Sequence, residues 1–181
     1  TFYRITLRNA PNFHVALNGA QGATFWGLRI DTPADARNTD GIDPGASQDV
    51  TITKSSIRTG DDNIAIKAGK GPSRHISIVE DHFYWGHGLS IGSEISAGVS
   101  DILVRDVTLD GTTSGLRIKS DASRGGLVDN VRYENICLRG NKRPIDFTTR
   151  YDEKVAGNDI PVYRDIFLSN VVGTTGTLAI E

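Results

Sequence analysis

Short segments in which apolar and polar residues alternate recur along the chain at a loose period of the high twenties. Successive segments begin 27, 26, 26, 29 and 35 positions apart, and each has a second apolar residue two places after the first. Alternation with a period of two is typical of a β-strand with one buried face. The expected strands of this first set start at Ala23, Val50, Ile76, Ile102, Val131 and Ile166.

A second set of short apolar segments interleaves with the first. Two short strands per repeat cannot bury an apolar face alone, whereas stacked repeats make one continuous core. With the right-handed connections usual between parallel strands, the pattern predicts an all-β protein, a right-handed parallel β-helix, as a single domain over residues 1–181. A β-sandwich is the alternative, and the scarcity of Asn-Gly hairpin signals disfavours it. The second set starts at Val15, Ile42, Ile64, Leu89, Leu116, Ile145 and Leu178.

Composition and charge narrow the functional classes. The 181 residues are 38% hydrophobic and 23% charged, which fits a globular protein. The net charge of -2 offers no basic surface for nucleic acid. No apolar run approaches the length of about 18 residues that spans a membrane, and the first residues lack the pattern of a signal peptide. The single cysteine, Cys137, excludes an internal disulfide, and we expect it to be a small core residue.

Equivalent positions of neighbouring repeats form columns, because parallel strands stack about 4.8 Å apart. The column two residues before each strand of the second set contains Asp40, Asp62 and His87 in three consecutive repeats, and Asp61 is adjacent to it. Strict alternation would turn Asp61 outward and Asp62 inward. Both residues lie at a turn, where alternation is unreliable, so their orientation stays open.

Two further columns are expected to face outward from the second set of strands. They place Arg117 and Lys119 on one face of one strand, a repeat beyond His87, unless this pair is only an exposed strand surface. The first column is Asp43, Ala65, Ser90, Arg117 and Asp146, and the second is Gly45, Lys67, Gly92, Lys119 and Thr148. A different set of polar residues recurs at the end of the first strands and is expected to cap turns: Ser55, Asp81, Asp106, Asn135 and Asn170.

Clustered carboxylates beside two cations have the parts that glycoside hydrolysis needs. One carboxylic acid protonates the leaving oxygen, and another carboxylate activates water or attacks the sugar carbon. Neighbouring negative charges raise the pKa of one member of such a cluster, which keeps a proton available. Arg117 and Lys119 would then bind an anionic group of the substrate.

Four tripeptides in this order resemble the signature of glycoside hydrolase family 28, the polygalacturonases: NTD at 38–40, GDD at 60–62, GHG at 86–88 and RIK at 117–119. The longer phrases NTDGIDP, GHGLSIGSE and GLRIKS resemble the bacterial members. Members of the family are considerably longer than this chain, so the resemblance identifies it as an internal fragment of a longer catalytic domain. Many relatives have cysteine after the paired aspartates, where this chain has Asn63, a position without an expected chemical role.

The resemblance implies hydrolysis of α-1,4 bonds between galacturonic acid units of de-esterified pectin, with inversion and without a metal or other cofactor. It makes Asp61 the general acid. Asp40 and Asp62 hold and activate the attacking water, and His87 supports the acid. The implied partner is polygalacturonate, acted on by a monomer that is secreted or periplasmic.

The same resemblance assigns Arg117 and Lys119 to a galacturonate carboxylate on the leaving-group side, and Tyr151 to the same sugar. Asn38, from the first motif, joins the expected substrate-binding residues, as does Lys67, which shares the outward column of Lys119. Lys67 is nearly as well explained as an exposed surface lysine.

Several functions remain open at this point. Endo action is expected, with exo action as the alternative. A pectate lyase also uses a parallel β-helix on this polymer, but it needs calcium and a strong base where this column supplies acids. A non-catalytic, sugar-binding β-helix is the third possibility.

Overall fold

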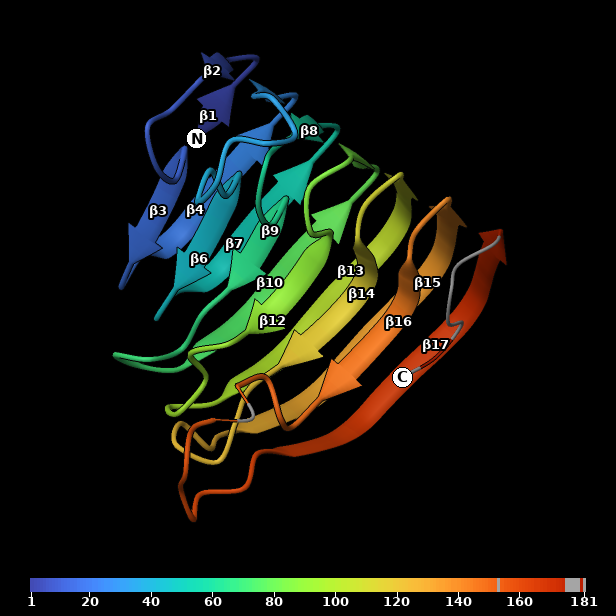
Figure 1. Ribbon diagram of the computed structural model, residues 1–181. Coiled ribbons are helices and arrows are strands. Elements are labelled where there is room, and N and C mark those ends of the chain that lie inside the picture. The colour runs from blue at the N-terminus through green and yellow to red at the C-terminus, as the bar shows by residue number, and fades with distance from the viewer. Residues whose placement is uncertain (153, 175–179, 181) are drawn as a thin grey trace.

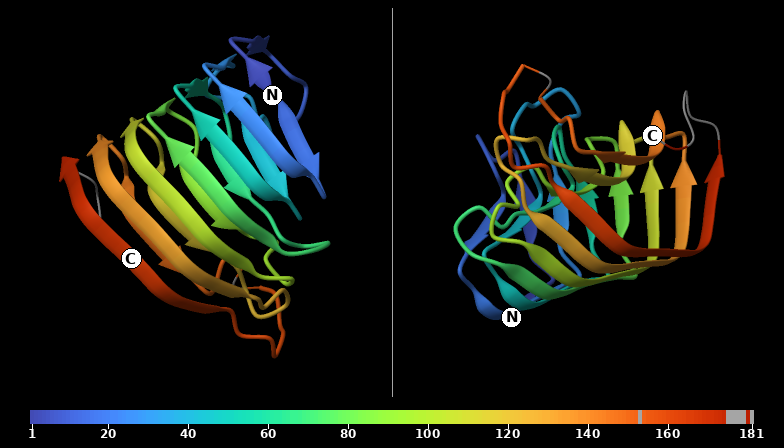
Figure 2. Two further views of the ribbon diagram at one scale, coloured as in Figure 1. Left: turned by 180° about the vertical axis from the view of Figure 1, so that it is seen from behind. Right: turned by 90° about the horizontal axis from the view of Figure 1, so that it is seen from below.

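The chain winds into a solenoid of parallel strands in the computed structural model, which describes residues 1–152, 154–174 and 180 (Figure 1). Every paired strand in the described residues runs parallel to its neighbours. The two termini lie at opposite ends of the stack (Figure 2). The predicted all-β parallel solenoid is therefore confirmed.

A six-stranded sheet, formed by the second set of predicted strands, carries the expected site at the beginning of its strands. Its strands are β3 (Val15–Asn18), β6 (Ile42–Gly45), β9 (Ile64–Ile66), β12 (Leu89–Gly92), β14 (Ser114–Lys119) and β16 (Arg143–Thr148). Below, this layer is called the site sheet.

An eleven-stranded sheet makes the rest of the wall. Two rows of short strands pair with the first and second halves of the long strand β13, which thereby joins them, and β15 and β17 extend the stack. One row contains β1 (Phe2–Tyr3), β4 (Gln21–Trp26), β7 (Gln48–Thr53) and β10 (Ser73–Val79), and the other β2 (Thr6–Arg8), β5 (Arg29–Asp31), β8 (Ser56–Arg58) and β11 (His82–Tyr84). The long strands are β13 (Val99–Asp110), β15 (Leu127–Arg139) and β17 (Val162–Thr174).

The core is the space between the two sheets, filled by stacked aliphatic side chains. In the site sheet, Ile42, Ile64, Leu89 and Leu116 form one such stack and are fully buried. Each side chain of this kind contributes about 1.5–3 kcal/mol through burial. This repeated burial fixes the register, because a slip by one residue would turn every apolar side chain outward.

The predicted register is confirmed along both strand sets in the described residues. Ala23 pairs with Val50, and the pairing continues position by position to Ile166. Val15 likewise pairs with Ile42, and the column continues to Ile145. Leu178 lies outside the described residues, but Ile180 bridges to Ile145, two positions later than the alignment expected.

Two structural expectations were wrong. The turn column divides into two neighbouring columns: Ser55 and Asp81 are buried, whereas Asp106, Asn135 and Asn170 form an exposed ladder of side-chain amides and a carboxylate. The ladder residues occupy the left-handed bend of the chain, with φ of 56, 54 and 51°, and the alignment was one residue out at this bend.

Cys137 is also not in the core. It lies on the outer face of β15, half-buried between the inward-facing Ile136 and Leu138. Its Sγ accepts a hydrogen bond from Arg139 Nε at 3.3 Å.

The described residues contain no helix that is long and apolar enough to cross a membrane.

Candidate active site

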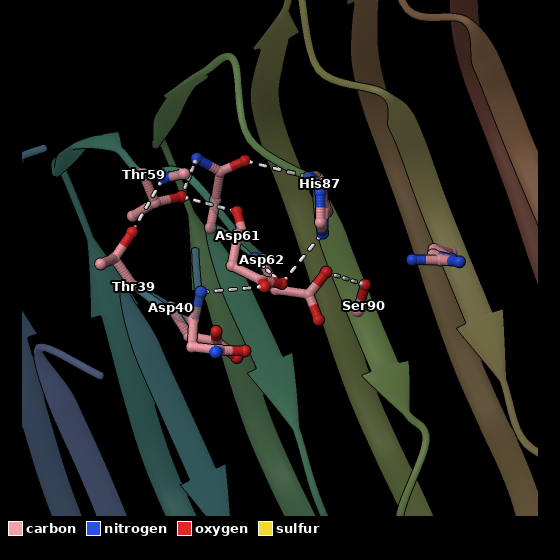
Figure 3. Close-up of polar contacts among 12 residues, drawn as sticks. Thr39, Asp40, Thr59, Asp61, Asp62, His87 and Ser90 are labelled. Atoms are coloured by element: carbon pink, nitrogen blue, oxygen red, sulfur yellow. Dashed lines mark hydrogen bonds and ion pairs between the residues drawn. The ribbon is translucent and has the colours of Figure 1, made fainter. Parts of the chain in front are cut away.

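The four residues expected to do the chemistry lie in three loops that lead into consecutive strands of the site sheet. Asp40 precedes β6, Asp61 and Asp62 precede β9, and His87 precedes β12. Stacking of these strands brings the four side chains together, as Figure 3 shows. The predicted catalytic cluster therefore exists as a spatial group.

Asp61 and His87 form a hydrogen-bonded ion pair. His87 Nδ1 lies 2.9 Å from Asp61 Oδ1, which also accepts the N–H of Asp62 at 2.8 Å. The other oxygen accepts the N–H of Asn38 at 3.3 Å, so the NTD and GDD motifs are joined here. Asn38 thus contributes its backbone to the site through a left-handed residue with φ of 56°.

The electrostatics of this pair oppose the simplest picture of a general acid. Burial raises the pKa of Asp61, but the hydrogen bond and charge of His87, the Asp62 N–H and Lys119 outweigh it and hold the pKa at about 2. The hydrogen bond to Asp61 in turn raises the pKa of His87 above its usual 6.5, against the effect of burial. Without substrate, the proton of this pair therefore resides on the imidazole.

Asp62 is buried between a cation and a hydroxyl. Its Oδ2 lies 2.8 Å from Lys119 Nζ, and its Oδ1 accepts the Ser90 hydroxyl at 2.8 Å. Both partners belong to outward columns of the site sheet, so Asp62 turns to the same side as Asp61. The alternation of the strand does not extend into the turn, because side-chain hydrogen bonds there replace the apolar contacts that enforce it.

Asp40 belongs to a second cluster, with Lys67 and Asp43. Lys67 Nζ lies 3.0 Å from Asp43 Oδ2 and 3.7 Å from Asp40 Oδ2. Burial, followed by the charges of Asp62 and Asp61, raises the pKa of Asp40 to about 6 against the effect of Lys67 and Lys119. The expected raised pKa in the carboxylate cluster thus falls on Asp40 and not on the predicted acid, because Asp61 has the imidazole as its immediate neighbour.

The predicted binding residues gather around the ring of Tyr151. Arg117 and Lys119 lie over this ring, with their cationic centres 5.5 and 5.1 Å from its centroid. Arg117 Nε also lies 3.3 Å from Asp146 Oδ2. Lys119 is already paired with Asp62, so a substrate carboxylate would share its ammonium and not meet a free cation. Tyr151 is 41% exposed.

Two residues near the site were not singled out by sequence reasoning. Arg124 is a third cation over Tyr151, 6.0 Å from the ring centroid. It donates to the Ser93 hydroxyl and lies 3.7 Å from Glu94. No signal marked it, because it sits in the loop after β14, outside the strand columns. Asp43 did stand in an outward column, and its buried position beside Asp40 is the signal that was overlooked.

The glycines of the GHG motif are required by close backbone contacts. Gly86 has φ of 67°, and a Cβ there would lie 2.4 Å from Asp61 O. Gly88 has φ of 87°, and a Cβ there would lie 2.0 Å from Ser114 O. Only glycine fits two positions that are both left-handed and crowded, so this motif presses the His87 turn against its two neighbouring turns.

Asn63 has a structural role that the sequence did not indicate. Its side chain is fully buried, donates toward Ile57 O at 3.2 Å and Thr59 Oγ1 at 3.1 Å, and accepts the N–H of Gly88 at 3.1 Å. It therefore joins the GDD turn to the turn that carries His87, which connects the expected acid to its supporting imidazole.

Among the described residues, one group has the geometry to hold a metal ion. Asp61, Asp62 and His87 offer ligand atoms within 4.8 Å of one another. Lys119 Nζ already places a positive charge 2.8 Å from Asp62 Oδ2, and a lysine is not a ligand while it is protonated. We assign no metal to this group.

Comparisons with known proteins agree with this site. The family model described as "Glycosyl hydrolases family 28" matches residues 1–181. An endo-polygalacturonase of Pectobacterium carotovorum subsp. carotovorum is 48% identical over 97% of this chain and 44% of its own length. A polygalacturonase of Ralstonia solanacearum is 43% identical over 94% of this chain and 38% of its own length.

Solved structures give the same result. The polygalacturonase of Erwinia carotovora superposes with a TM-score of 0.89 at 40% identity, over 99% of this chain and 54% of that one. An exopolygalacturonase of Thermotoga maritima reaches a TM-score of 0.90 at 27% identity, over 97% of this chain and 41% of that one. This chain thus spans about half or less of each of these relatives. The match along its whole length, together with the four motifs gathered at one site, shows that the chain belongs to glycoside hydrolase family 28, the family of the polygalacturonases.

Proposed function

We propose that the protein is an inverting polygalacturonase that cleaves α-1,4 bonds within de-esterified pectin. The observation that supports this most strongly is the single cluster of Asp40, Asp61, Asp62 and His87 beside the cations around Tyr151. A carboxylate polymer fits a site in which acid–base groups stand next to an arginine and a lysine.

In the proposed mechanism, Asp61 donates its proton to the oxygen that leaves as the glycosidic bond breaks. A water molecule attacks the sugar carbon from the opposite face and passes its proton to Asp40 or Asp62. Arg117, Lys119 and Tyr151 hold the sugar on the leaving-group side, and Asn38 shapes the site through its backbone.

The low pKa of ligand-free Asp61 needs a source of protons on binding. His87 supplies one, because its Nδ1 lies 2.9 Å from Asp61. An anionic galacturonate placed beside Asp61 adds a like charge, which raises the pKa of this carboxyl and favours transfer of the proton to it. Substrate binding would thus convert the ion pair into a neutral acid beside a neutral imidazole.

Endo action is proposed because two relatives that are 48% identical to this chain are named endo-polygalacturonases. Exo action is the alternative, since a structure that matches at 27% identity is an exopolygalacturonase. We further propose a monomer located where pectin is met, outside the cell or in the periplasm.

The test uses purified full-length protein and polygalacturonate. We expect new reducing ends of which the first-formed anomer is inverted, as followed by proton NMR, and a rapid fall in viscosity typical of internal cleavage. A calcium-dependent unsaturated product would instead identify a lyase, and binding of oligogalacturonates without new reducing ends would identify a non-catalytic protein. Release of one short product from the first time point would select exo action.

A further inference from the structure

Asp43 is a buried carboxylate with little to compensate its charge. It lies in β6, one residue after the core residue Ile42, on the outer side of the site sheet, and is only 3% exposed. Apart from its ion pair with Lys67, neither of its oxygens has a hydrogen-bond partner among the described residues. Burial of such a group is costly, and nothing in the proposed chemistry uses it.

Lys67 links this carboxylate to the site. Its ammonium lies 3.0 Å from Asp43, 3.7 Å from Asp40 and 4.6 Å from the centroid of the Phe13 ring. Its backbone N–H is fixed by Pro44 O at 2.8 Å, so the lysine starts from a set position on the next strand. The side chain is only 25% exposed, which argues against a freely exposed surface lysine.

The other charges around Asp40 leave Lys67 as its nearest cation. Asp61 and Asp62 face Asp40 and raise its pKa, whereas Lys67 and Lys119 lower it. Lys119 is held by Asp62 at 2.8 Å. Lys67 itself faces Asp43, Asp40 and, more weakly, Glu94, and these charges raise its pKa although burial alone lowers it. The ammonium is therefore charged at any pH at which the site would work.

We propose that Asp43 is a positioning residue which anchors the Lys67 ammonium beside Asp40, so that Lys67 serves as the counter-ion of a water-activating carboxylate and not as a contact for the sugar. The proposal rests on the function proposed above, since it presumes that Asp40 acts as a base. It changes the expected role of Lys67 from substrate binding to control of the charge on Asp40.

Removal of the two partners should have opposite consequences. Without the lysine, Asp40 loses its nearest cation and holds its proton more tightly. Without the carboxylate, Asp40 loses a like charge, and Lys67 is released toward it. Burial and the charge of Asp40 raise the pKa of Asp43 to about 8, and this repulsion is mutual. A residue that only packs the strand would not give shifts of opposite sign.

The experiment compares full-length wild type with Lys67→Met and Asp43→Asn. The acidic limb of kcat/KM on polygalacturonate reports the ionisation of the base in the free enzyme. We expect this limb to move up by about one pH unit in Lys67→Met and down in Asp43→Asn, in line with the usual effect of a charge at this distance. Lys67→Arg should restore the wild-type limb, and Lys70→Met, which removes an exposed lysine of the following loop, should leave it unchanged.

An increase in KM for Lys67→Met at an unchanged acidic limb would show that Lys67 binds the sugar, and shifts of the same sign in both variants would also overturn the proposal. Carbon-13 NMR titration of the aspartate carboxyls, assigned with Asp40→Asn, measures the same shifts without turnover. If wild type hydrolyses no polygalacturonate, the proposed function fails, and this titration still decides whether Lys67 and Asp43 control Asp40. Thermal unfolding of each variant confirms that the folded protein is being titrated.

Discussion

Asp61 and Asp81 are similar carboxylates in different turns of the solenoid, and they hold protons very differently. Each accepts a backbone N–H at short range, Asp61 from Asp62 at 2.8 Å and Asp81 from Ser55 at 2.7 Å. Burial raises the pKa of Asp81 to about 8, and the two backbone N–H groups near it do not compensate. The pKa of Asp61 falls to about 2 because His87 and Lys119 more than offset its burial.

The difference teaches that a backbone hydrogen bond does not keep a buried carboxyl ionised in this fold, whereas a neighbouring cation does. Both cations near Asp61 come from later repeats, His87 from the next one and Lys119 from the one after it. The repeat architecture thus makes a turn into a site by supplying charges from the neighbouring turns. Asp81 has no such neighbour among the described residues.

The largest effect is expected where the difference between the two turns matters for chemistry. Asp61→Asn removes the proposed proton donor and should lower kcat on polygalacturonate by about 100- to 10,000-fold, with the thermal stability reduced only slightly. The matched control is Asp81→Asn, which changes the same functional group outside the site. Full activity in Asp61→Asn would show that the acid has been misassigned.

Asp81→Asn should remove a pH-dependent loss of stability. The folded-state pKa of about 8 lies above the reference value of 3.8, so the unfolded chain ionises first and the free energy of unfolding falls as pH rises between these values. One proton corresponds to about 1.4 kcal/mol per pH unit, which gives up to about 4 kcal/mol between pH 5 and pH 8.

Urea unfolding of wild type and Asp81→Asn at both pH values measures this directly. The gain in stability from the substitution should be greater at pH 8 than at pH 5. An equal difference at the two values would show that Asp81 ionises normally despite its burial.

His87→Gln should make Asp61 more like Asp81. The amide can still donate a hydrogen bond, but the positive charge is lost, so the pKa of Asp61 should rise from about 2 toward its reference value of 3.8. The stability that Asp61 contributes above pH 3.8 would then be lost at a higher pH during acidification. We expect kcat to fall about tenfold, and carboxyl titration by NMR to report the pKa. An unchanged titration would mean that Lys119 alone keeps Asp61 ionised.

The smallest effect is expected where a hydrogen bond is lost and a cation is kept. Ser90→Ala removes the hydroxyl that donates to Asp62 at 2.8 Å and leaves Lys119 in place. A single hydrogen bond contributes about 0.5–1.5 kcal/mol, so kcat/KM should fall by about three- to tenfold. Lys119→Met is the comparison variant, and a larger loss in Ser90→Ala than in Lys119→Met would reverse the lesson drawn from Asp61 and Asp81.

Much of the fold was predictable from the sequence because one physical rule repeats in every coil. Apolar residues two positions apart must face the same core, so aligning Ile42, Ile64 and Leu89 in the sequence also aligned them in space. The alignment was wrong at the left-handed bends, such as Asp106, where polar side chains bond to one another and no burial constrains the register. Cys137 was misplaced by the same weakness, since a small residue carries little information about which face it occupies.

The sequence by itself determined which residues of this protein share a coil position, and thereby that Asp40, Asp61, Asp62 and His87 meet at one site. Only the tertiary structure decided that both Asp61 and Asp62 face outward, and which cation belongs to which carboxylate. The pairing of Asp61 with His87, of Asp62 with Lys119 and of Asp40 with Lys67 depends on contacts of 2.8–3.7 Å between different coils. Such contacts, and the burial that sets the proton affinity of each group, arise from how the turns pack, and no periodicity in the chain encodes them.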